Sequence, residues 1–404
     1  MQQTWTLEEG LKPLFPIFLF FGAIIIPLSS VLDTIGETMD PKAPRIGIFI
    51  YICDELLNKK LKIKDIEEYS KSLKYVEYAR ALNCISENNQ NIISEAISKN
   101  KLDRIVFAPA PEDKMIEKTV LDSGISPHFI EYANIKEQAA WVHSNVDDAT
   151  AKAELLIAMA VAKMRGSKAV AGNEGARVNT QLCSGCGICT ITCRYNAIDF
   201  IKDGDHRVAD VNQDLCEKCG ACVAACPSGS MNMSGFSNEA MISEIEECTT
   251  GLLESKEPFP RIVVFACSWC SYPAADAAGE KHIELDPSFC LIKTPCSARV
   301  DPEWVMKALS NGADGVLVLG GKEGHCHYRG GNVKTNNRMT LLSKVIESLG
   351  YDKKRIGVDW VNPEEPELFA EIVKNFVAHI KEVGPNPERG IPLDEQPTSA
   401  LHHE

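Results

Sequence analysis

Hydrophobic residues between positions 45 and 165 alternate between short unbroken apolar runs and stretches in which they recur every three or four positions. Unbroken runs are typical of strands buried in a parallel sheet, and the spaced pattern is typical of amphipathic helices. Such an alternation predicts an α/β unit with a mostly parallel sheet covered by helices. The predicted strands are 46–51, 76–82, 105–108 and 129–132, and the predicted helices are 63–73, 89–99, 112–122 and 147–165.

The same pattern returns between residues 261 and 384. There the predicted strands are 262–266, 291–294, 316–319 and 356–360, and the predicted helices are 302–309, 340–349 and 366–382. Aligning the apolar runs that follow Arg45 and Arg261 superposes Tyr51 on Cys267 and brings Cys84 near the strand end that corresponds to Cys296. The two units are therefore either an internal duplication or unrelated sheets whose buried strands look alike.

The segments outside these units differ in composition. Residues 166–180 and 251–260 read as linkers, 238–247 reads as a short helix, and the proline-rich residues 385–404 read as a flexible tail. The N-terminal extension, residues 1–44, contains twenty uncharged residues at 13–32, a length that just spans a bilayer but is interrupted by prolines. Three interpretations stay open: a membrane or interfacial anchor, an apolar arm docked on a partner, and a non-native extension ahead of a start at Met39.

Charge and cysteine usage narrow the function. A formal net charge of −14 argues against nucleic acid as a partner, because phosphates would be repelled. Sixteen cysteines in a long chain, spaced for metal, point to a reducing compartment. We therefore expect a cytoplasmic protein, with membrane contact through residues 13–32 as the one exception.

Eight of the sixteen cysteines form two copies of the pattern C-x2-C-x2-C-x3-C, which is typical of a bacterial-type ferredoxin with two 4Fe-4S clusters. In such modules the fourth cysteine of each run binds the other cluster. The first cysteine group is therefore Cys183, Cys186, Cys189 and Cys226, and the second cysteine group is Cys216, Cys219, Cys222 and Cys193. Zinc is the alternative, but the x3 spacing of the fourth cysteine favours clusters. The fold class is thus two parallel-sheet α/β units, residues 45–165 and 261–384, flanking a two-cluster ferredoxin module at 175–247.

Four more cysteines fall at the carboxyl ends of predicted strands, where the loops of a parallel sheet converge on ligands. This third cysteine group is Cys267, Cys270, Cys296 and Cys326. Four thiolates suit 2Fe-2S, 4Fe-4S or zinc alike, and the neighbouring ferredoxin module favours a redox cluster.

Several residues near the third cysteine group are candidates for metal binding or for contact with a cluster. Cys290 precedes its predicted strand and reads as a buried apolar thiol. His325 and His327 flank Cys326, and a loop or packing role is expected for both because four thiolates already complete a site. Arg299 either donates to cluster sulfur or pairs with Asp301 at the surface.

With these residues in place, residues 261–384 resemble the iron–sulfur D subunit of methyl-viologen-reducing hydrogenase. The resemblance lies in Cys267-Ser-Trp-Cys-Ser-Tyr, Cys296-Ser-Ala-Arg-Val-Asp-Pro and Gly324-His-Cys-His-Tyr, with Gly330 and Asn332 beyond. It implies a 2Fe-2S cluster on the third cysteine group and a link between a hydrogenase or formate dehydrogenase and a heterodisulfide reductase. Gly321 stands where the family has a further cysteine.

Residues 45–247 resemble the A subunit of heterodisulfide reductase without its FAD-binding domain. The resemblance lies in Ala133-Asn-Ile-Lys-Glu-Gln-Ala-Ala-Trp-Val-His-Ser and in Gly235-Phe-Ser-Asn-Glu. No dinucleotide fingerprint lies between these parts, so no FAD is expected in this chain. Tyr51 and Pro109 stand at family cysteine positions, which leaves Cys53 and Cys84 and implies that the N-terminal unit holds no cluster.

These expectations describe an electron-transfer subunit of an oxidoreductase complex, in energy metabolism of the methanogenic type. It would relay electrons between a hydrogenase or formate dehydrogenase and a separate flavoprotein of the heterodisulfide reductase type. The sequence shows no substrate-converting site, and no catalytic residue is assigned. The alternative is a structural adapter of such a complex, with zinc in the third cysteine group.

Overall fold

The computed structural model describes residues 43–52, 55–84, 86, 88–111, 113–168, 175–204, 206–254 and 259–387, and the strand backbone of 19–21 and 24–26. The chain divides into two compact units, Met1–Ala43 and Pro44–Glu404. In the first unit, Leu19–Phe21 (β1) and Ile24–Ile26 (β2) pair as antiparallel strands. The apolar run at 13–32 is therefore not one continuous helix. Among the described helices, none combines the length and the hydropathy that a membrane span requires.

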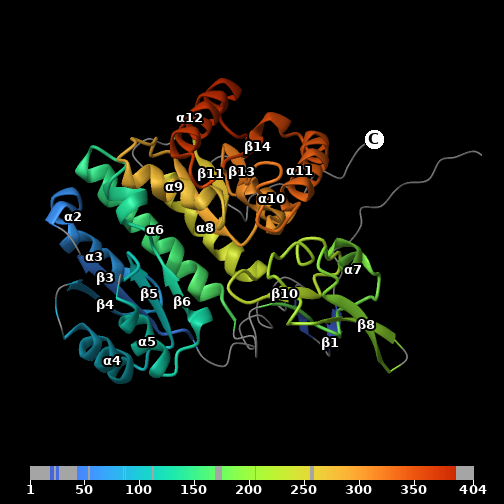
Figure 1. The fold of residues 1–404 in the computed structure, drawn as a ribbon, viewed down its shortest axis with the longest axis horizontal. Helices are drawn as coiled ribbons and strands as arrows, with labels where there is room; N and C mark the ends of the chain where they lie inside the picture. Colours follow the sequence, from blue (N-terminus) through green and yellow to red (C-terminus); the bar gives the residue numbers. More distant parts are fainter. Residues whose placement is uncertain are drawn as a thin grey trace, which may run out of the picture. The chain divides into compact units, whose positions relative to one another are not determined.

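The first sheet has four parallel strands in the order β4-β3-β5-β6 (Figure 1). Its central strand alternates between two cores, because successive side chains of a strand point to opposite faces. Ile48 and Ile50 face one core, and Phe49 and Tyr51 face the other. The strands are Ile46–Ile52 (β3), Val76–Asn83 (β4), Arg104–Ala108 (β5) and Ile130–Tyr132 (β6), and the helices are Glu55–Lys60 (α2), Ile63–Ser72 (α3), Asn89–Asn100 (α4), Lys114–Asp122 (α5) and Val146–Gly166 (α6).

The second sheet repeats this topology in the order β12-β11-β13-β14, again all parallel. In both sheets the first strand is central, the second lies on one side, and the third and fourth lie on the other. This shared order is what an internal duplication would leave. The strands are Ile262–Cys267 (β11), Phe289–Thr294 (β12), Gly315–Gly320 (β13) and Ile356–Trp360 (β14), and the helices are Ser271–Glu280 (α9), Pro302–Ser310 (α10), Gly331–Ser348 (α11) and Pro366–Val383 (α12).

Two long helices lie side by side between the sheets (Figure 1): α6 and α8, which spans Asn238–Glu254. The alanine-rich α6 is capped at its N-terminus by Asn145, whose side chain accepts from the backbone N–H of Asp147 at 2.7 Å. One hydrophobic core runs from β3 through α6 and α8 to β11, with Ile48, Met159, Ile245 and Phe265 among its buried members. The two α/β units are therefore packed together as one body.

The cysteine-rich segment between the helices carries only short elements. Two antiparallel pairs, β8 with β9 and β7 with β10, frame its cysteine loops. These elements are Ala176–Val178 (β7), Ile188–Thr192 (α7), Ile198–Asp203 (β8), His206–Val211 (β9) and Met231–Met233 (β10).

The predicted strands agree with the structure to within about two residues. Two predicted helices and both predicted linkers have different bounds, and two further helices were not predicted. Helix α8 continues to Glu254, through part of the predicted linker at 251–260, and β7 lies inside the predicted linker at 166–180. Helix α11 begins at Gly331, whereas the predicted helix begins at residue 340. The prediction missed the first turns because their residues are mostly polar. Helices α2 and α9 were not predicted: α2 has six residues, and α9 contains Pro273 and Gly279, which mask its pattern.

The predicted tail is ordered where it begins. Asn386 is buried, and its backbone N–H donates to Asp314 Oδ1 at 2.7 Å. Its side-chain amide donates to the carbonyls of Leu309 and Ala313 at 2.8 and 2.7 Å. The expectation of flexibility from residue 385 is therefore wrong for 385–387, and residues 388–404 lie outside the described part.

We expect Gly279→Ala to destabilise the contact between the two α/β units. Gly279, on α9, lies against a π-helical turn at Lys136–Ala140, and a Cβ at this position would lie 2.2 Å from the carbonyl oxygen of Glu137. Because backbone must move to relieve this overlap, the free energy of unfolding should fall by about 1–3 kcal/mol in a denaturant titration. Glu280→Ala, at the next and exposed position, is the control. An unchanged midpoint for Gly279→Ala would contradict the close contact.

Candidate functional site

The first cysteine group surrounds one small cavity. Cys183, Cys186, Cys189 and Cys226 line it together with Phe200, Ala209, Ser228 and Ser230. Gly185 has a φ of +65°, and a Cβ there would lie 2.6 Å from the carbonyl oxygen of Arg207. Only glycine fits this turn without strain. The structure thus brings the four cysteines together although Cys226 belongs to the second run.

Hydrogen-bond donors surround the sulfurs of this group. The backbone N–H of Ala209 donates to Cys183 Sγ at 3.4 Å. The hydroxyls of Ser230 and Ser228 lie 3.2 and 3.6 Å from Cys226 Sγ. Burial opposes ionisation, but these hydrogen bonds hold the pKa of Cys226 below its usual value. The thiolate is the form that binds iron, so the donor set fits a cluster.

The second cysteine group also lies together. Burial raises the pKa of Cys222, and the neighbouring charges of Cys219, Cys216 and Cys193 raise it further. Cys189 of the first group and Cys222 are buried in the same small core, so the two groups are neighbours. Gly220, with a φ of +73°, makes the turn between Cys219 and Cys222.

The third cysteine group is buried at the carboxyl edge of the second sheet. Cys267 Sγ and Cys270 Sγ are 4.0 Å apart, and Cys296 and Cys326 pack in one small core. The pKa of Cys267 is lowered by the neighbouring thiols of Cys270 and Cys296, and the pKa of Cys326 is lowered mainly by the thiol of Cys296. Helix α9 begins directly after Cys270, and β11 ends at Cys267.

Two glycines make room beside the third group. A Cβ at Gly321 would lie 2.6 Å from Cys270 Sγ, and a Cβ at Gly331 would lie 2.4 Å from Cys296 Sγ. Side chains there would fill the space that a bound group needs, so the site fits one. Among the residues the structure describes, no set of three or more histidine, cysteine and acidic side chains is arranged for a single metal ion. Clusters bind their thiolates through different irons, which is consistent with this wider arrangement.

Aromatic residues cover the third group. The ring of His327 stacks on Trp269 at 3.8 Å between centroids, and Trp269 Nε1 donates to the hydroxyl of Tyr328 at 2.9 Å. His325 is exposed. Both histidines therefore have the loop and packing positions that the sequence favoured.

Two expectations near this group need correction. Cys290 lies inside β12 rather than before it, and it is buried against Cys248, away from the third group. Arg299 does pair with Asp301, at 3.8 Å, but it is fully buried, so the surface ion pair is wrong. In the N-terminal unit, Cys84 is disulfide-bonded, and Cys53 lies outside the described residues.

The second and third cysteine groups face each other. Cys219 and Tyr195 pack in one small core with Cys296, Cys326 and Tyr328. Across the same contact, Lys334 Nζ donates to the carbonyl of Thr192 at 2.7 Å, and a Cβ at Gly330 would lie 3.1 Å from Arg194 Nη1. No motif in the sequence marks this adjacency, because it joins loops that are distant in the sequence.

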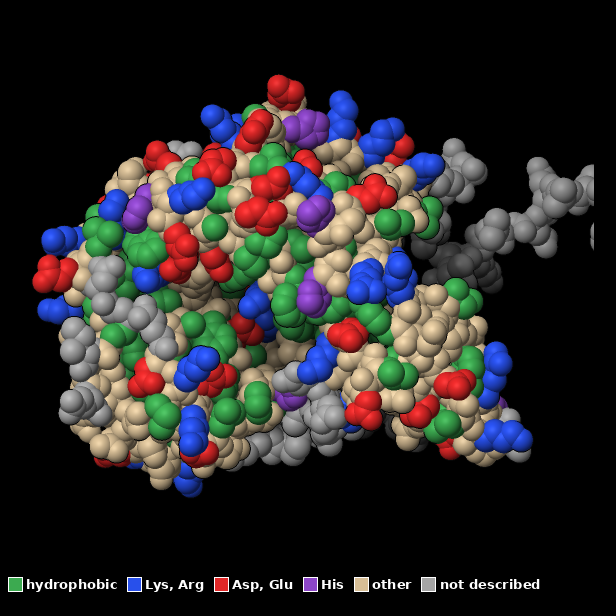
Figure 2. All heavy atoms as spheres, in the orientation of Figure 1, with side chains coloured by type: hydrophobic (Ala, Val, Ile, Leu, Met, Phe, Trp, Pro, Cys, Tyr) green, Lys and Arg blue, Asp and Glu red, His purple; other side chains and the backbone are tan. Residues whose placement is uncertain are grey.

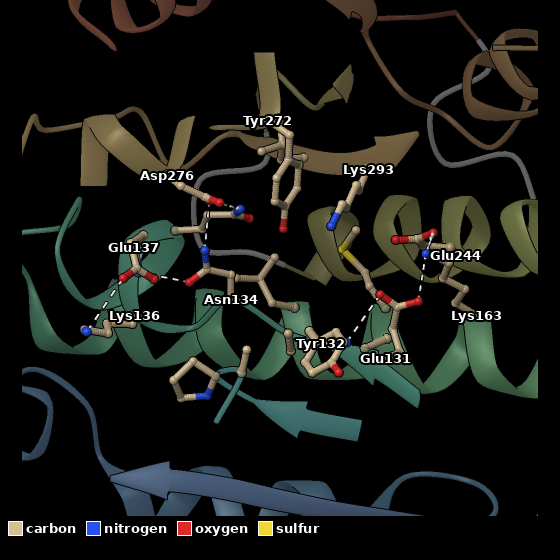
Figure 3. Close-up of a pocket in the computed structure, with 18 residues that line it drawn as sticks. Glu131, Tyr132, Asn134, Lys136, Glu137, Lys163, Glu244, Tyr272, Asp276 and Lys293 are labelled. Atoms are coloured by element: carbon tan, nitrogen blue, oxygen red, sulfur yellow. Dashed lines mark hydrogen bonds and ion pairs between the residues drawn. The ribbon is translucent and has the colours of Figure 1, made fainter. Parts of the chain in front are cut away.

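A separate cavity of about 340 Å³ lies between the two α/β units (Figure 3). Figure 2 shows this face of the molecule hollowed, with acidic and basic side chains near the hollow. Lys163, on α6, is buried and pairs with Glu131 at 2.8 Å and with Glu244 at 3.8 Å. On the opposite wall, Asp276 Oδ1 accepts from Asn134 at 2.8 Å and from Gln138 at 2.9 Å. Sequence reasoning missed this polar cavity.

Burial controls the charges in this cavity. It raises the pKa of Glu244 to about 7, although the Lys163 ammonium opposes the shift. It also raises the pKa of Asp276 to about 6, against the hydrogen bond from Gln138. Glu244 Oε2 is buried without a hydrogen-bond partner. Above pH 7 the folded protein must therefore keep a poorly solvated carboxylate at Glu244.

We expect Glu244→Gln to stabilise the protein at pH 8 but not at pH 4.5. Because the pKa of Glu244 is raised on folding, wild-type stability falls as the pH rises through the range 4.5 to 7, and the neutral amide removes this loss. The gain at pH 8 should be on the order of 2 kcal/mol by denaturant titration. Glu239→Gln, exposed on the same helix, is the control. A gain for Glu244→Gln that does not change with pH would contradict the assignment.

Two parts of the chain match known protein families. The family model described as "Methyl-viologen-reducing hydrogenase, delta subunit" matches residues 262–384, and the model described as "4Fe-4S dicluster domain" matches residues 182–230. The iron-sulfur D subunit of the F420-non-reducing hydrogenase of Archaeoglobus profundus is 44% identical over 131 residues, which are 32% of this chain and 96% of that protein.

The N-terminal region matches the A subunit of heterodisulfide reductase. The A subunit of the ferredoxin/F(420)H(2)-dependent CoB-CoM heterodisulfide reductase of Methanosarcina acetivorans is 42% identical over 211 residues, and its Methanosarcina mazei counterpart is 40% identical over the same length. These matches cover 52% of this chain but only 26% of the reductase proteins, so the chain spans about a quarter of their length. The chain therefore belongs to the family of hydrogenase iron–sulfur D (delta) subunits through its C-terminal unit, and it joins to that unit a region of the heterodisulfide reductase A subunit.

Proposed function

We propose that this chain is an iron–sulfur electron-transfer subunit with three centres in a row. The first and second cysteine groups would each hold a 4Fe-4S cluster, and the third would hold a 2Fe-2S cluster. The observation that carries the proposal is the arrangement of the groups: the first adjoins the second through Cys189 and Cys222, and the second adjoins the third through Cys219 and Cys296. Short steps between neighbouring centres are what electron transfer requires. The order is therefore third, second, first.

Both ends of this row reach the surface. At the first group Cys186 is exposed, and the apolar side chains of Leu182 and Ile191 nearby are 54% and 86% exposed. At the third group Trp269, which covers the cysteines, is 50% exposed. Exposed apolar side chains of this kind favour contact with another protein. Each end thus offers a place where a redox partner docks.

The relatives indicate the partners. A region of 52% of the chain is similar to part of a CoB-CoM heterodisulfide reductase, and another region of 32% is similar to a subunit of an F420-non-reducing hydrogenase. We infer that electrons pass between a hydrogenase or formate dehydrogenase at the third group and a heterodisulfide-reductase-type flavoprotein at the first. The flavin would then belong to another subunit.

Metal content tests the number of centres. Anaerobically purified protein should contain about ten irons per chain, four for each cubane and two for the third centre, with matching acid-labile sulfide. Fewer than about four irons would contradict the electron relay.

A second candidate follows from one distance. The 4.0 Å separation of Cys267 Sγ and Cys270 Sγ is close to that of two thiolates on one zinc ion. With zinc in the third group, the C-terminal unit would be a structural adapter. Absorption and EPR spectra of the reduced protein separate the two candidates, because zinc is redox-silent: about eight irons with one zinc would favour the adapter.

We expect Cys326→Ser to disconnect the third centre while leaving the others. The variant should lose about two irons and the 2Fe-2S EPR signal, because one thiolate ligand is missing. Reduction of the 4Fe-4S clusters by a hydrogenase should slow at least about tenfold, whereas reduction by dithionite should not change. His325→Ala, one residue away and exposed, is the matched control. Unchanged reduction by hydrogenase would show that electrons enter elsewhere.

A further inference from the structure

A fully buried guanidinium lies between the second cysteine group and the C-terminal unit. Arg299 has no exposed surface, and its aliphatic stem lies on the loop that joins Cys219 to Cys222. A Cβ at Gly220 of this loop would lie 2.6 Å from Arg299 Cδ and 3.0 Å from its Cβ. The absence of a side chain at residue 220 therefore lets the arginine approach the cysteine loop closely.

Only part of this guanidinium is satisfied by the protein. Nη2 donates to the carbonyl of Phe236 at 2.9 Å and to Asn238 Oδ1 at 2.7 Å. Nε and Nη1 are buried without a hydrogen-bond acceptor, and the carboxylate of Asp301 is 3.8 Å from Nη1. The guanidinium also lies over the ring of Trp304, at 4.1 Å from the centroid.

The Asp301 carboxylate compensates this buried cation only in part. Burying a cation is costly unless charges and acceptors compensate it, and two free donors add to the cost. Cys222, whose charge acts on Arg299, belongs to the second group. A reduced cluster on that group carries more negative charge than an oxidised one, so it would compensate Arg299 better after it has taken up an electron.

We propose that Arg299 raises the reduction potential of the cluster held by Cys193, Cys216, Cys219 and Cys222, through its buried positive charge and through Nε and Nη1, which have no hydrogen-bond acceptor. This inference rests on the proposed function. It adds to that function a residue that makes the middle cluster easier to reduce. The step is a one-electron reduction of the cluster by the neighbouring third centre, which is oxidised by one electron, with no bond made or broken in Arg299. Buried in a region of low dielectric, one cation has a large effect on a nearby charge.

The chain supplies its own comparison. Arg207 lies beside the first cysteine group, where its Nε donates to the carbonyl of Gly185 at 3.2 Å. It is exposed to solvent, which screens its charge. Arg299 at the second group is thus buried, whereas Arg207 at the first group is exposed.

The test is an EPR-monitored redox titration of the complete chain, with its clusters loaded, in the wild type and in five variants. Arg299→Gln should lower the midpoint potential of one 4Fe-4S cluster, the one whose signal changes in Cys216→Ser, and leave the other where it was. Arg299→Lys should restore much of the potential, because it keeps the charge but not the planar donors. Arg207→Gln should shift neither cluster by a comparable amount.

Asp301→Asn should shift the same cluster in the opposite direction. The change removes the carboxylate that partly neutralises Arg299 but keeps an N-cap for α10, where Asp301 accepts from the N–H of Glu303 at 3.0 Å. The midpoint potential of this cluster should therefore rise while the fold is kept. This variant tests the inference even if Arg299→Gln does not fold.

The outcomes separate two failures. Two loaded 4Fe-4S clusters with wild-type potentials in Arg299→Gln would overturn the inference, as would an unshifted potential in Asp301→Asn. Equal shifts of both clusters would also overturn it. A wild-type protein without two 4Fe-4S signals would instead overturn the proposed function.

Discussion

The packing of α6 against α8 is the contact on which the rest of the structure depends. It places both sheets around one hydrophobic core, and α8 begins directly after the cysteine-rich segment. The first residue of α8, Asn238, accepts a hydrogen bond from Arg299 of the C-terminal unit. A cysteine segment with little core of its own is in this way held at a fixed place against the third cysteine group, although its own strands are only three to six residues long.

Local chemistry is readable from the sequence, and long-range packing is not. The spacing of Cys183 to Cys226 defines two groups because most ligands of one cluster must lie on one loop, and the buried strands are visible as unbroken apolar runs. The full length of α8 is hidden because Gly251 interrupts its apolar pattern. The polar cavity at Lys163 and Glu244 is hidden as well, because its walls come from both α/β units and no motif marks them.

The two sheets differ in the residue at the carboxyl end of their central strands. At the carboxyl end of the central strand, the second sheet carries Cys267 and the first carries Tyr51, which is 2% exposed. An aromatic ring at this position fills space that thiolates and a cluster would otherwise need. Pro109, after β5, lines the polar cavity instead of a metal site. We propose that the first unit is a support and that the redox centres lie in the other two parts of the chain.

The exchange of ligands between the two cysteine runs has a consequence for biosynthesis. Because Cys226 closes the first group and Cys193 closes the second, neither set of four exists until both runs have been synthesised and brought together. Iron delivered when only one run has been synthesised would find an incomplete set of cysteine ligands. If both groups hold clusters as proposed, maturation of the two sites would be a single cooperative event, and a chain interrupted between residues 193 and 216 would acquire neither cluster.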